Sequence, residues 1–181
     1  LVCAIALALD GWVRLPDGRY PEGAVLIISE ICAKNETIIA DNDGKYRDYI
    51  ELYNGGEPVS LKNYPFYDGK TKSQPLADIV LQTGEYRVFY ISRSVTGFAL
   101  NASGGDTIQL LDGAGHVIAQ TNTAPLDTDE VMHYLNGAYQ QSYDATPGFS
   151  NDASGRAMFL NGNEVQQLPL VISEILLRNV S

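Results

Sequence analysis

Short apolar runs separated by turn-forming residues follow one another along the chain from residue 25 onward. No long stretch has a 3.6-residue apolar period, so helix is expected only in short turns. Strands at intervals of about 8–12 residues are typical of a β-sandwich or barrel. The expected strands are 25–33, 46–53, 59–61, 65–67, 76–81, 86–92, 98–100, 106–111, 116–121 and, as the last one, 131–134.

The alternation within these strands also predicts a core. Residues 24–151 are expected to form an all-β, antiparallel two-sheet sandwich, because their apolar positions recur with the period of a strand. The predicted core residues are Ile28, Ile31, Ile50, Leu52, Leu61, Val88, Leu100, Ile108 and Leu110.

One pattern occurs twice. Leu26–Asn35 is echoed by Leu170–Asn179, and both contain Ile-Ser-Glu-Ile. The spacing is that of a whole domain, since solenoid units repeat every ~20–50 residues. We therefore expect a module at 24–151, then a linker and the first strand of a truncated second repeat at 152–181. The strand Leu170–Leu177 is expected to dock as an added strand, on its own module or on a neighbouring molecule.

The N-terminal segment, residues 1–23, opens with nine uncharged apolar residues, Leu1–Leu9. This run is too short to span a membrane. Two interpretations stay open. Ala6-Leu7-Ala8 has the small-x-small form of a signal-peptide cleavage site, which suggests a signal or anchor remnant. Alternatively, the Asp10-Gly11 turn forms a hairpin between this run and residues 12–15.

Composition narrows the classes of partner. The chain has 181 residues, 45% of them hydrophobic, and a net charge of −10. Nucleic-acid binding depends on Lys and Arg that neutralise phosphates, so no nucleic-acid partner is expected. The same charge argues against an anionic membrane surface, and no direct membrane insertion by the module is expected. Cations and basic partners are favoured.

Few residues suggest chemistry. The two histidines, His116 and His133, stand in predicted strands, where a lone histidine is usually a surface or packing residue. No Gly-x-Ser-x-Gly elbow, phosphate loop or His-x-x-x-His pair is present, so we expect no enzyme activity. Cys3 and Cys32 have no metal-knuckle spacing; free or buried thiols are favoured over a disulfide of an exported protein.

An acidic stretch offers a possible cofactor site. It contains Glu30, Glu36, Asp41, Asp43, Asp48 and Glu51. Carboxylates on a Gly-containing loop can supply the oxygens that Ca²⁺ prefers, so Asp41, Asp43 and Asp48 are candidate metal ligands and Ca²⁺ is the one possible cofactor. The alternative is a solvated turn in which the Asp side chains bond backbone amides. Glu30 and Glu51 have a further alternative, as partly buried carboxylates satisfied by Arg or backbone amides.

Several pieces of the chain, in this order, resemble the lamin tail domain. They are Ile28-Ser29-Glu30-Ile31 with Asn35, Asp41–Gly44, Asp48-Tyr49-Ile50-Glu51-Leu52-Tyr53-Asn54, Val59–Leu61 with Tyr64, Gly84–Tyr86, Phe98–Leu100, Thr107–Asp112, and Thr146-Pro147-Gly148 with Asn151. The match covers about residues 24–151, with Tyr49 where many members have Trp. It implies an immunoglobulin-like sandwich in a bacterial secreted or surface protein, where such modules often stand in tandem.

Two functions compete. The first is a non-catalytic interaction or adhesion module, extracellular or anchored at the cell surface, that binds a protein or glycan there. The alternative is a Ca²⁺-dependent carbohydrate-binding module accessory to an enzyme domain elsewhere in the parent chain. The many tyrosines bear on both, because exposed aromatic rings stack on sugars or contact protein partners. In strands, however, Tyr is more often a half-buried cover of the core.

Overall fold

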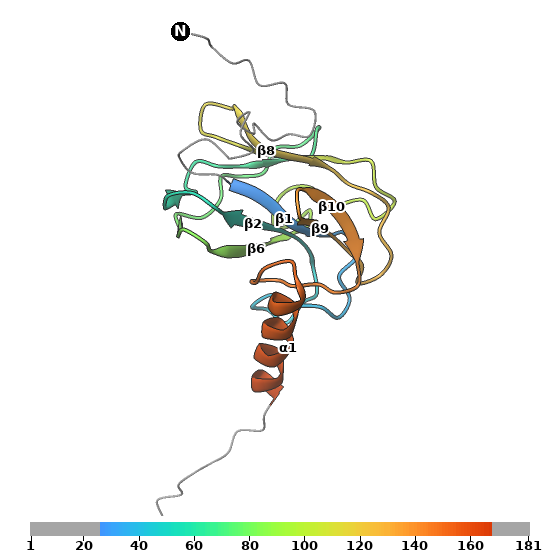
Figure 1. Cartoon of the computed structure of the whole chain (residues 1–181). Coiled ribbons are helices and arrows are strands. Elements are labelled where there is room, and N and C mark those ends of the chain that lie inside the picture. The colour runs from blue at the N-terminus through green and yellow to red at the C-terminus, as the bar shows by residue number, and fades with distance from the viewer. Residues whose placement is uncertain (1–25, 168–181) are drawn as a thin grey trace, which may run out of the picture.

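The computed structural model describes residues 26–167, and the side chains through residue 162 (Figure 1). The expectations for residues 1–23 and for the strand at 170–177 lie outside the described residues. The elements are β1 Leu26–Cys32, β2 Asp48–Asn54, β3 Val59–Ser60, β4 Phe66–Tyr67, β5 Val80–Leu81, β6 Tyr86–Ile91, β7 Thr107–Leu111, β8 Val117–Asn122, β9 Val131–Leu135, β10 Ala138–Ser142 and α1 Ala153–Gln167.

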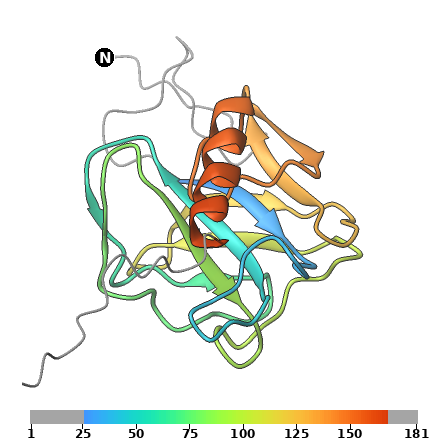
Figure 2. The same cartoon turned by 90° about the horizontal axis from the view of Figure 1, so that it is seen from below.

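The strands form an antiparallel sandwich. The larger sheet has the order β10-β9-β1-β2-β6, the second has β4-β7-β8, and β3 pairs with β5. Ile28 of β1, Leu52 of β2 and Leu110 of β7 belong to one buried cluster, so both sheets contribute to the core. The all-β sandwich expected from the sequence is confirmed. α1 projects away from the sandwich below the larger sheet (Figures 1 and 2).

A bulge in β1 explains why its core residues are three positions apart. In a regular strand, Ile28 and Ile31 would face opposite sides of the sheet. Here Ile28 pairs with Leu52 while Glu30 pairs with Glu51, so Ser29 is an extra residue in β1. Both isoleucines therefore reach the core. Ser29 and Glu30 both turn to the outer face of the sheet, where Glu51 lies.

The predicted core is correct except at one position. Ile28, Ile31, Ile50, Leu52, Leu61, Leu100, Ile108 and Leu110 are buried. Val88 is only half-buried, because it pairs with Glu51 on the outer face of the sheet. It packs there against a second cluster of Cys32, Tyr49, Val131 and Ala145. Phe89 takes the core side instead and contacts Phe66 edge to face.

Three expectations about elements were wrong. Residues 98–100 form no strand, although Phe98 and Leu100 are buried. β9 is not the last strand, because Asn136 and Gly137 turn the chain into β10 with positive φ angles of 52° and 89°. That dipeptide is a strong hairpin signal. Helix is not confined to short turns, because the region 152–181, expected to begin as a linker, contains the 15-residue helix α1, which Asp152 caps by accepting a hydrogen bond from the Gly155 N–H at 2.8 Å.

Helix α1 forms despite its turn-forming residues because its first turns dock on the sandwich. Gly155 lies so close to the Ser150 carbonyl that a Cβ would sit 1.8 Å from the oxygen, and Phe159, one turn later, is buried. These contacts supply the stability that a weakly helical sequence lacks.

Within the described residues no helix is long and apolar enough to cross a membrane.

Replacing Leu52 by Ala tests the core. Leu52 is fully buried between the sheets, so we expect Leu52→Ala to lower the free energy of unfolding by about 2–5 kcal/mol. Val80→Ala, at a side chain that is 49% exposed on β5, is the control and should change it by about 0.5 kcal/mol or less. Denaturant titration measures both. Equal effects of the two changes would contradict the core assignment.

Candidate functional site: a groove beside a buried carboxylate pair

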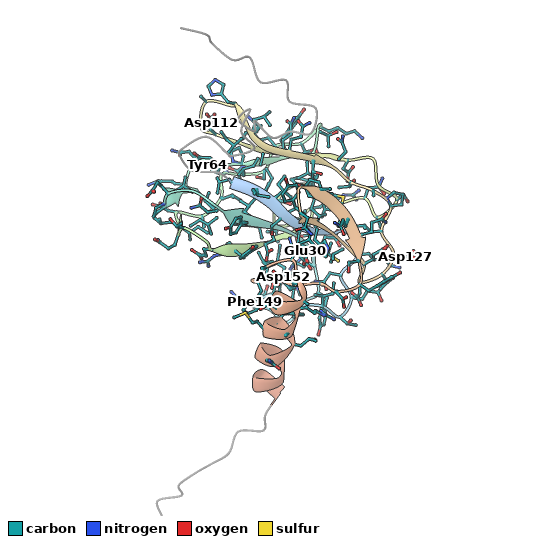
Figure 3. The ribbon with its side chains drawn as sticks, viewed as in Figure 1. Glu30, Tyr64, Asp112, Asp127, Phe149 and Asp152 are labelled. Carbon is teal, nitrogen blue, oxygen red and sulfur yellow. The ribbon has the colours of Figure 1, made fainter. Side chains whose placement is uncertain are left out.

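Two glutamates lie side by side inside the protein. Glu30 of β1 and Glu51 of β2 are paired across the sheet, and neither has any exposed surface. Figure 3 shows Glu30 where the larger sheet meets the chain leading into α1, close to Asp152 and Phe149. Burying a carboxylate is unfavourable unless hydrogen bonds replace its water. The donors around this pair are therefore its most informative feature.

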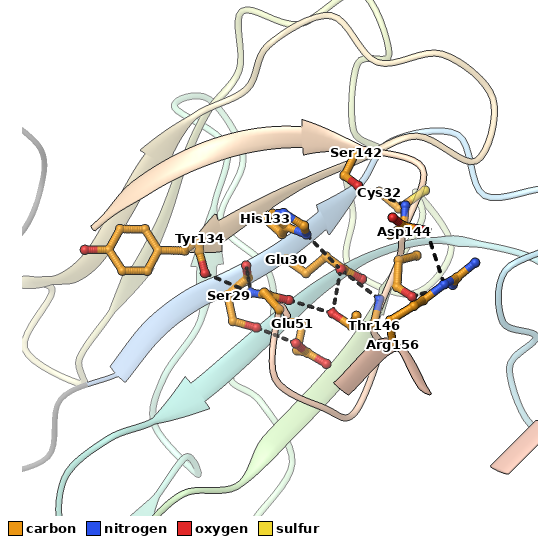
Figure 4. A network of polar contacts seen from close by, with 12 residues as sticks. Ser29, Glu30, Cys32, Glu51, His133, Tyr134, Ser142, Asp144, Thr146 and Arg156 are labelled. Atoms are coloured by element: carbon orange, nitrogen blue, oxygen red, sulfur yellow. Dashed lines mark hydrogen bonds and ion pairs between the residues drawn. The ribbon is translucent and has the colours of Figure 1, made fainter. Parts of the chain in front are cut away.

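Hydroxyl and backbone donors surround both carboxylates (Figure 4). The Tyr49 hydroxyl donates to Glu30 Oε1 at 2.6 Å, and the Thr146 N–H donates to Glu30 Oε2 at 3.0 Å. The Ser29 hydroxyl donates to Glu51 Oε1, and the Gly148 N–H donates to Glu51 Oε2. Gly148 has a φ of 88°, a conformation that favours glycine and aims its amide at Glu51.

Asn151 completes this arrangement. Its side-chain amide donates to the carbonyls of Ser29 at 2.9 Å and Tyr134 at 3.1 Å. The Thr146 hydroxyl lies 2.7 Å from Asn151 Oδ1 and 3.2 Å from Glu30 Oε2. We call Glu30, Glu51, Thr146, Gly148 and Asn151 the carboxylate latch, because their bonds fasten residues 146–151 to the outer face of the sheet.

Burial dominates the electrostatics of the latch. It raises the pKa of Glu51 well above the ordinary value, and the neighbouring Glu30 raises that pKa further, against the hydrogen bonds from Ser29 and Gly148. Burial also raises the pKa of Glu30, while the bonds from Tyr49 and Thr146 oppose it. Since both carboxyl groups are sealed from solvent, the latch fixes a chain segment and offers no surface to a substrate.

His133 lies next to the latch. It pairs with Glu30 across β9 and β1, and its Nδ1 atom is 4.0 Å from Glu30 Oε2. This nitrogen is buried and has no hydrogen-bond partner among the described residues. Burial lowers the pKa of His133, which favours the neutral imidazole. The other histidine, His116, is exposed in a hairpin and lies 2.9 Å from the carboxylate of Asp112.

A groove of about 490 Å³ runs between the β9–β10 hairpin and α1. On the helix side, Ala153, Arg156, Ala157 and Leu160 line it at the i, i+3, i+4 and i+7 positions of one face. On the sheet side it is lined by His133, Leu135, Gln140, Gln141, Ser142 and Asp144, and Asn151 and Asp152 close the end where the helix begins. The latch therefore adjoins the groove through Asn151.

The charged groups of the groove are largely occupied by internal partners. Arg156 donates to the Ala145 carbonyl at 2.6 Å, lies 3.6 Å from the Asp144 carboxylate and stacks over the Phe159 ring. The Gly155 amide at the start of α1 lowers the pKa of Asp152. The side-chain amides are engaged too, since Gln141 donates to the Pro125 carbonyl at 2.6 Å and Asn151 to two carbonyls of the latch region, so the groove offers mainly apolar helix surface.

The strand β10, which lines the groove together with β9, is an edge strand of the larger sheet. Within the described residues, β10 pairs only with β9. Every second residue of an edge strand turns its N–H and C=O outward, and proteins usually protect such edges with charges, Pro or bulges. β10 has the sequence Ala-Tyr-Gln-Gln-Ser and contains neither charge nor Pro. The opposite edge, β6, carries Arg87, which pairs with Glu85.

The acidic turn proposed for Ca²⁺ is held by internal bonds. Asp41 accepts hydrogen bonds from the Asp43 and Lys45 amides at 2.9 Å each and pairs with Arg47. The Lys45 amide and Arg47 lower the pKa of Asp41. Asp43 is exposed in the same turn. These contacts match the solvated-turn interpretation of the sequence.

Asp48 stands apart in its environment. It begins β2, and burial raises its pKa to about 6 against bonds from the Leu100 and Asn35 amides. The part of the chain that the structure describes holds no group of three or more His, Cys, Asp or Glu residues suited to a metal. It does not unite Asp41, Asp43 and Asp48 in such a group, and Ca²⁺ binding stays a prediction.

The remaining candidates have structural positions. Cys32 is a free, buried thiol whose pKa burial raises to about 12, so it is not a reactive thiolate; Cys3 lies outside the described residues.

Most tyrosines are half-buried, as expected for covers of the core: Tyr53, Tyr64, Tyr67, Tyr86, Tyr90, Tyr134 and Tyr139. Tyr49 is fully buried, and Tyr46 and Tyr143 are exposed.

The sequence indicated the two buried glutamates and only part of their hydrogen-bond partners. The expected backbone amides are present, at Thr146 and Gly148, but the hydroxyl donors of Ser29, Tyr49 and Thr146 were not foreseen. Asn151 as a bridge and the groove beside β10 were also missed. The signals were present: Thr146-Pro147-Gly148 with Asn151 stood out as a motif, and Asn136-Gly137 marked the hairpin.

Comparison of the chain with protein-family models, with curated proteins and with solved structures gives no match. The resemblance to the lamin tail domain therefore rests on the motifs quoted above. Three of those motifs, Ile28–Ile31, Asp48–Asn54 and Thr146–Asn151, meet in the latch and the core beneath it.

The raised pKa of Glu51 predicts a pH dependence. A carboxyl group whose pKa is higher in the folded state than the ordinary 4.5 stabilises less as the pH rises above that value. We expect Glu51→Gln, which cannot ionise, to gain stability relative to the unmodified chain as the pH rises from about 5 to 8, by at most ~1.4 kcal/mol per pH unit. Denaturant titrations at several pH values measure the difference. A difference that stays constant with pH would contradict the raised pKa.

A Ca²⁺ titration decides the acidic turn. If Asp41, Asp43 and Asp48 bound Ca²⁺, the metal at about 100 times its dissociation constant would raise the free energy of unfolding by ~2.7 kcal/mol. The internal bonds of Asp41 predict instead the same melting temperature with Ca²⁺ and with chelator. An increase with Ca²⁺ that Asp43→Asn abolishes would establish the metal site.

Proposed function

We propose that this chain is a non-catalytic interaction module of a secreted or cell-surface protein, and that it binds a protein partner in the groove between β10 and α1. The observation that carries the proposal is that β10, an edge strand with no second pairing partner among residues 26–167, lines a groove together with an apolar face of α1. An extended peptide can add a strand to such an edge, with backbone bonds that give affinity and side-chain contacts that give specificity.

The dimensions and lining of the groove support this mode of binding. Its volume of about 490 Å³ lies within the ~300–1,000 Å³ of typical ligand sites. Side chains of a strand placed along β10 would meet Ala157 and Leu160 on the helix, and Gln140 and Ser142 on the sheet. The contacts are apolar on one wall and amide-rich on the other, a combination that suits a polypeptide better than a highly charged ligand.

The carboxylate latch supports the proposal in a second way. Residues 146–151 are fixed to the sheet by Glu30 and Glu51, and α1 begins two residues after Asn151. The start of the helical wall is thereby positioned before any partner arrives. A preorganised site binds more tightly because less conformational entropy is lost on association.

The resemblance to the lamin tail domain is the basis for the surface location and for the expectation of tandem modules. The net charge of −10 favours a basic or neutral partner over an acidic one. We propose an adhesion or scaffolding role in which this module contributes binding energy, while any chemistry belongs to other proteins or other parts of the parent chain.

Paired substitutions on α1 test the groove. Leu160 lines the groove and is 45% exposed, whereas Met158 is 55% exposed on the same helix and does not line it. Short peptides selected from a random display library against the full chain provide the probe. We expect Leu160→Asp to weaken a selected peptide by about tenfold or more, ~1.4 kcal/mol, and Met158→Asp to leave its affinity within about twofold. Fluorescence anisotropy measures both.

The outcomes are distinct. Selection that yields no binder, or binders that are indifferent to Leu160→Asp, would remove the groove as the interaction surface. A screen against esters, glycosides, phosphodiesters and peptides addresses the non-catalytic part of the proposal. Turnover that a single substitution abolishes would overturn it.

A further inference from the structure

We propose that the partner of the groove is a basic peptide segment, which places a Lys or Arg side chain on the carboxylate of Asp144 while an apolar side chain covers the face of α1. This inference rests on the proposed function and names the residue that sets its specificity. The acidic balance of the whole chain does not choose a position for a basic partner. The way in which the groove uses its polar groups does.

Most polar groups that line the groove already have internal partners. The side-chain amides of Gln140 and Gln141 donate to backbone carbonyls at 3.4 and 2.6 Å. The hydroxyl of Ser142 accepts the N–H of Asp144 at 2.9 Å, and the Nδ1 atom of His133 is buried. A ligand in the groove therefore meets few polar side chains that are free to bond with it.

Two of the charged residues in the groove are occupied in the same way. The carboxylate of Asp152 accepts hydrogen bonds from the Ser150 hydroxyl at 3.0 Å and from the Gly155 N–H at 2.8 Å. Arg156 donates to the Ala145 carbonyl at 2.6 Å. These bonds hold the start of α1 against the chain that precedes it, so neither charged group is free to turn toward a ligand.

Asp144 differs from both. Its side chain is 77% exposed, and its Oδ1 atom lies 3.6 Å from Arg156 Nε, which is longer than a hydrogen bond. Its Oδ2 atom has no hydrogen-bond partner within the described residues. The surroundings are acidic too, since the charges of Asp127 and Glu130, after desolvation, raise the pKa of the adjacent Tyr143. An ammonium or guanidinium group can therefore bind the open side of Asp144.

Together, the apolar helix face and Asp144 define the class of partner. An apolar segment would cover Ala157 and Leu160 but would take water from Asp144 without replacing it, which is unfavourable. An acidic segment would be repelled. A segment with one basic and one apolar side chain satisfies both parts of the groove. Because an exposed ion pair contributes little affinity, Asp144 selects among partners more than it strengthens binding.

The first experiment compares peptide selection against three full-length proteins. They are the unmodified chain, Asp144→Asn and the control Asp43→Asn, which makes the same charge change at an exposed residue that does not line the groove. We expect Lys and Arg to be enriched over the library in peptides selected with the unmodified chain and with Asp43→Asn, and the enrichment to be lost with Asp144→Asn. Equal melting temperatures show that all three proteins keep the fold.

The second experiment tests for direct contact with one selected peptide and its variant in which the basic residue is Gln. We expect Asp144→Asn and the peptide change each to weaken binding by about two- to fivefold, as for an exposed ion pair. Combined, they should weaken it no more than either does alone, because both remove the same contact. Fluorescence anisotropy at low salt measures the affinities, and the loss should shrink as salt is added.

The outcomes separate this inference from the proposed function. Selected peptides without basic enrichment, effects that multiply when the two changes are combined, or an equal loss in Asp43→Asn would each overturn the contact with Asp144. The proposed function survives these results if Leu160→Asp still weakens the peptide. Peptides that are indifferent to Leu160→Asp, or a selection without binders, overturn the proposed function and this inference together.

Discussion

Two buried carboxylates constrain the rest of this structure. Glu30 and Glu51 lie together without exposed surface, and a buried carboxylate is tolerated only when hydrogen bonds replace its hydration. The sheet supplies Ser29 and Tyr49 as donors, and the remaining donors come from Thr146 and Gly148. The sandwich therefore satisfies its own β1–β2 pair only when the C-terminal part of the described chain closes over it.

The bulge at Ser29 links this constraint to the hydrophobic core. Without an extra residue in β1, either Ile28 or Ile31 would face away from the core, or Glu30 would enter it. With the bulge, the same four residues, Ile28–Ile31, bury the two isoleucines on one face of the sheet and place Ser29 and Glu30 among the hydrogen bonds of the carboxylates on the other face. Losing the register would therefore cost stability on both faces at once, which makes the pairing of β1 with β2 strongly specified.

The sequence allowed most strands and most of the core to be predicted, because alternation reports directly on burial. The prediction that Val88 belongs to the core was wrong because β6 has large residues on both faces, so its core-facing positions were assigned one residue out of place. α1 was missed because its helix depends on tertiary contacts at Gly155 and Phe159 that no local pattern contains. The latch was only half predicted for a similar reason: Thr146 lies 116 residues from Glu30, and Gly148 lies 97 residues from Glu51.

The groove follows from how little of α1 the sandwich holds. The latch fixes the chain up to Asn151, and Gly155 and Phe159 dock one side of the first helical turns. The neighbouring face, with Ala157 and Leu160, is left opposite a strand edge that has no pairing partner among the described residues. Apolar helix surface and open backbone groups on one side of a small acidic domain are both more stable when covered. The same carboxylate pair that closes the core thus also fixes the position at which α1 begins and, with it, the helical wall of the groove.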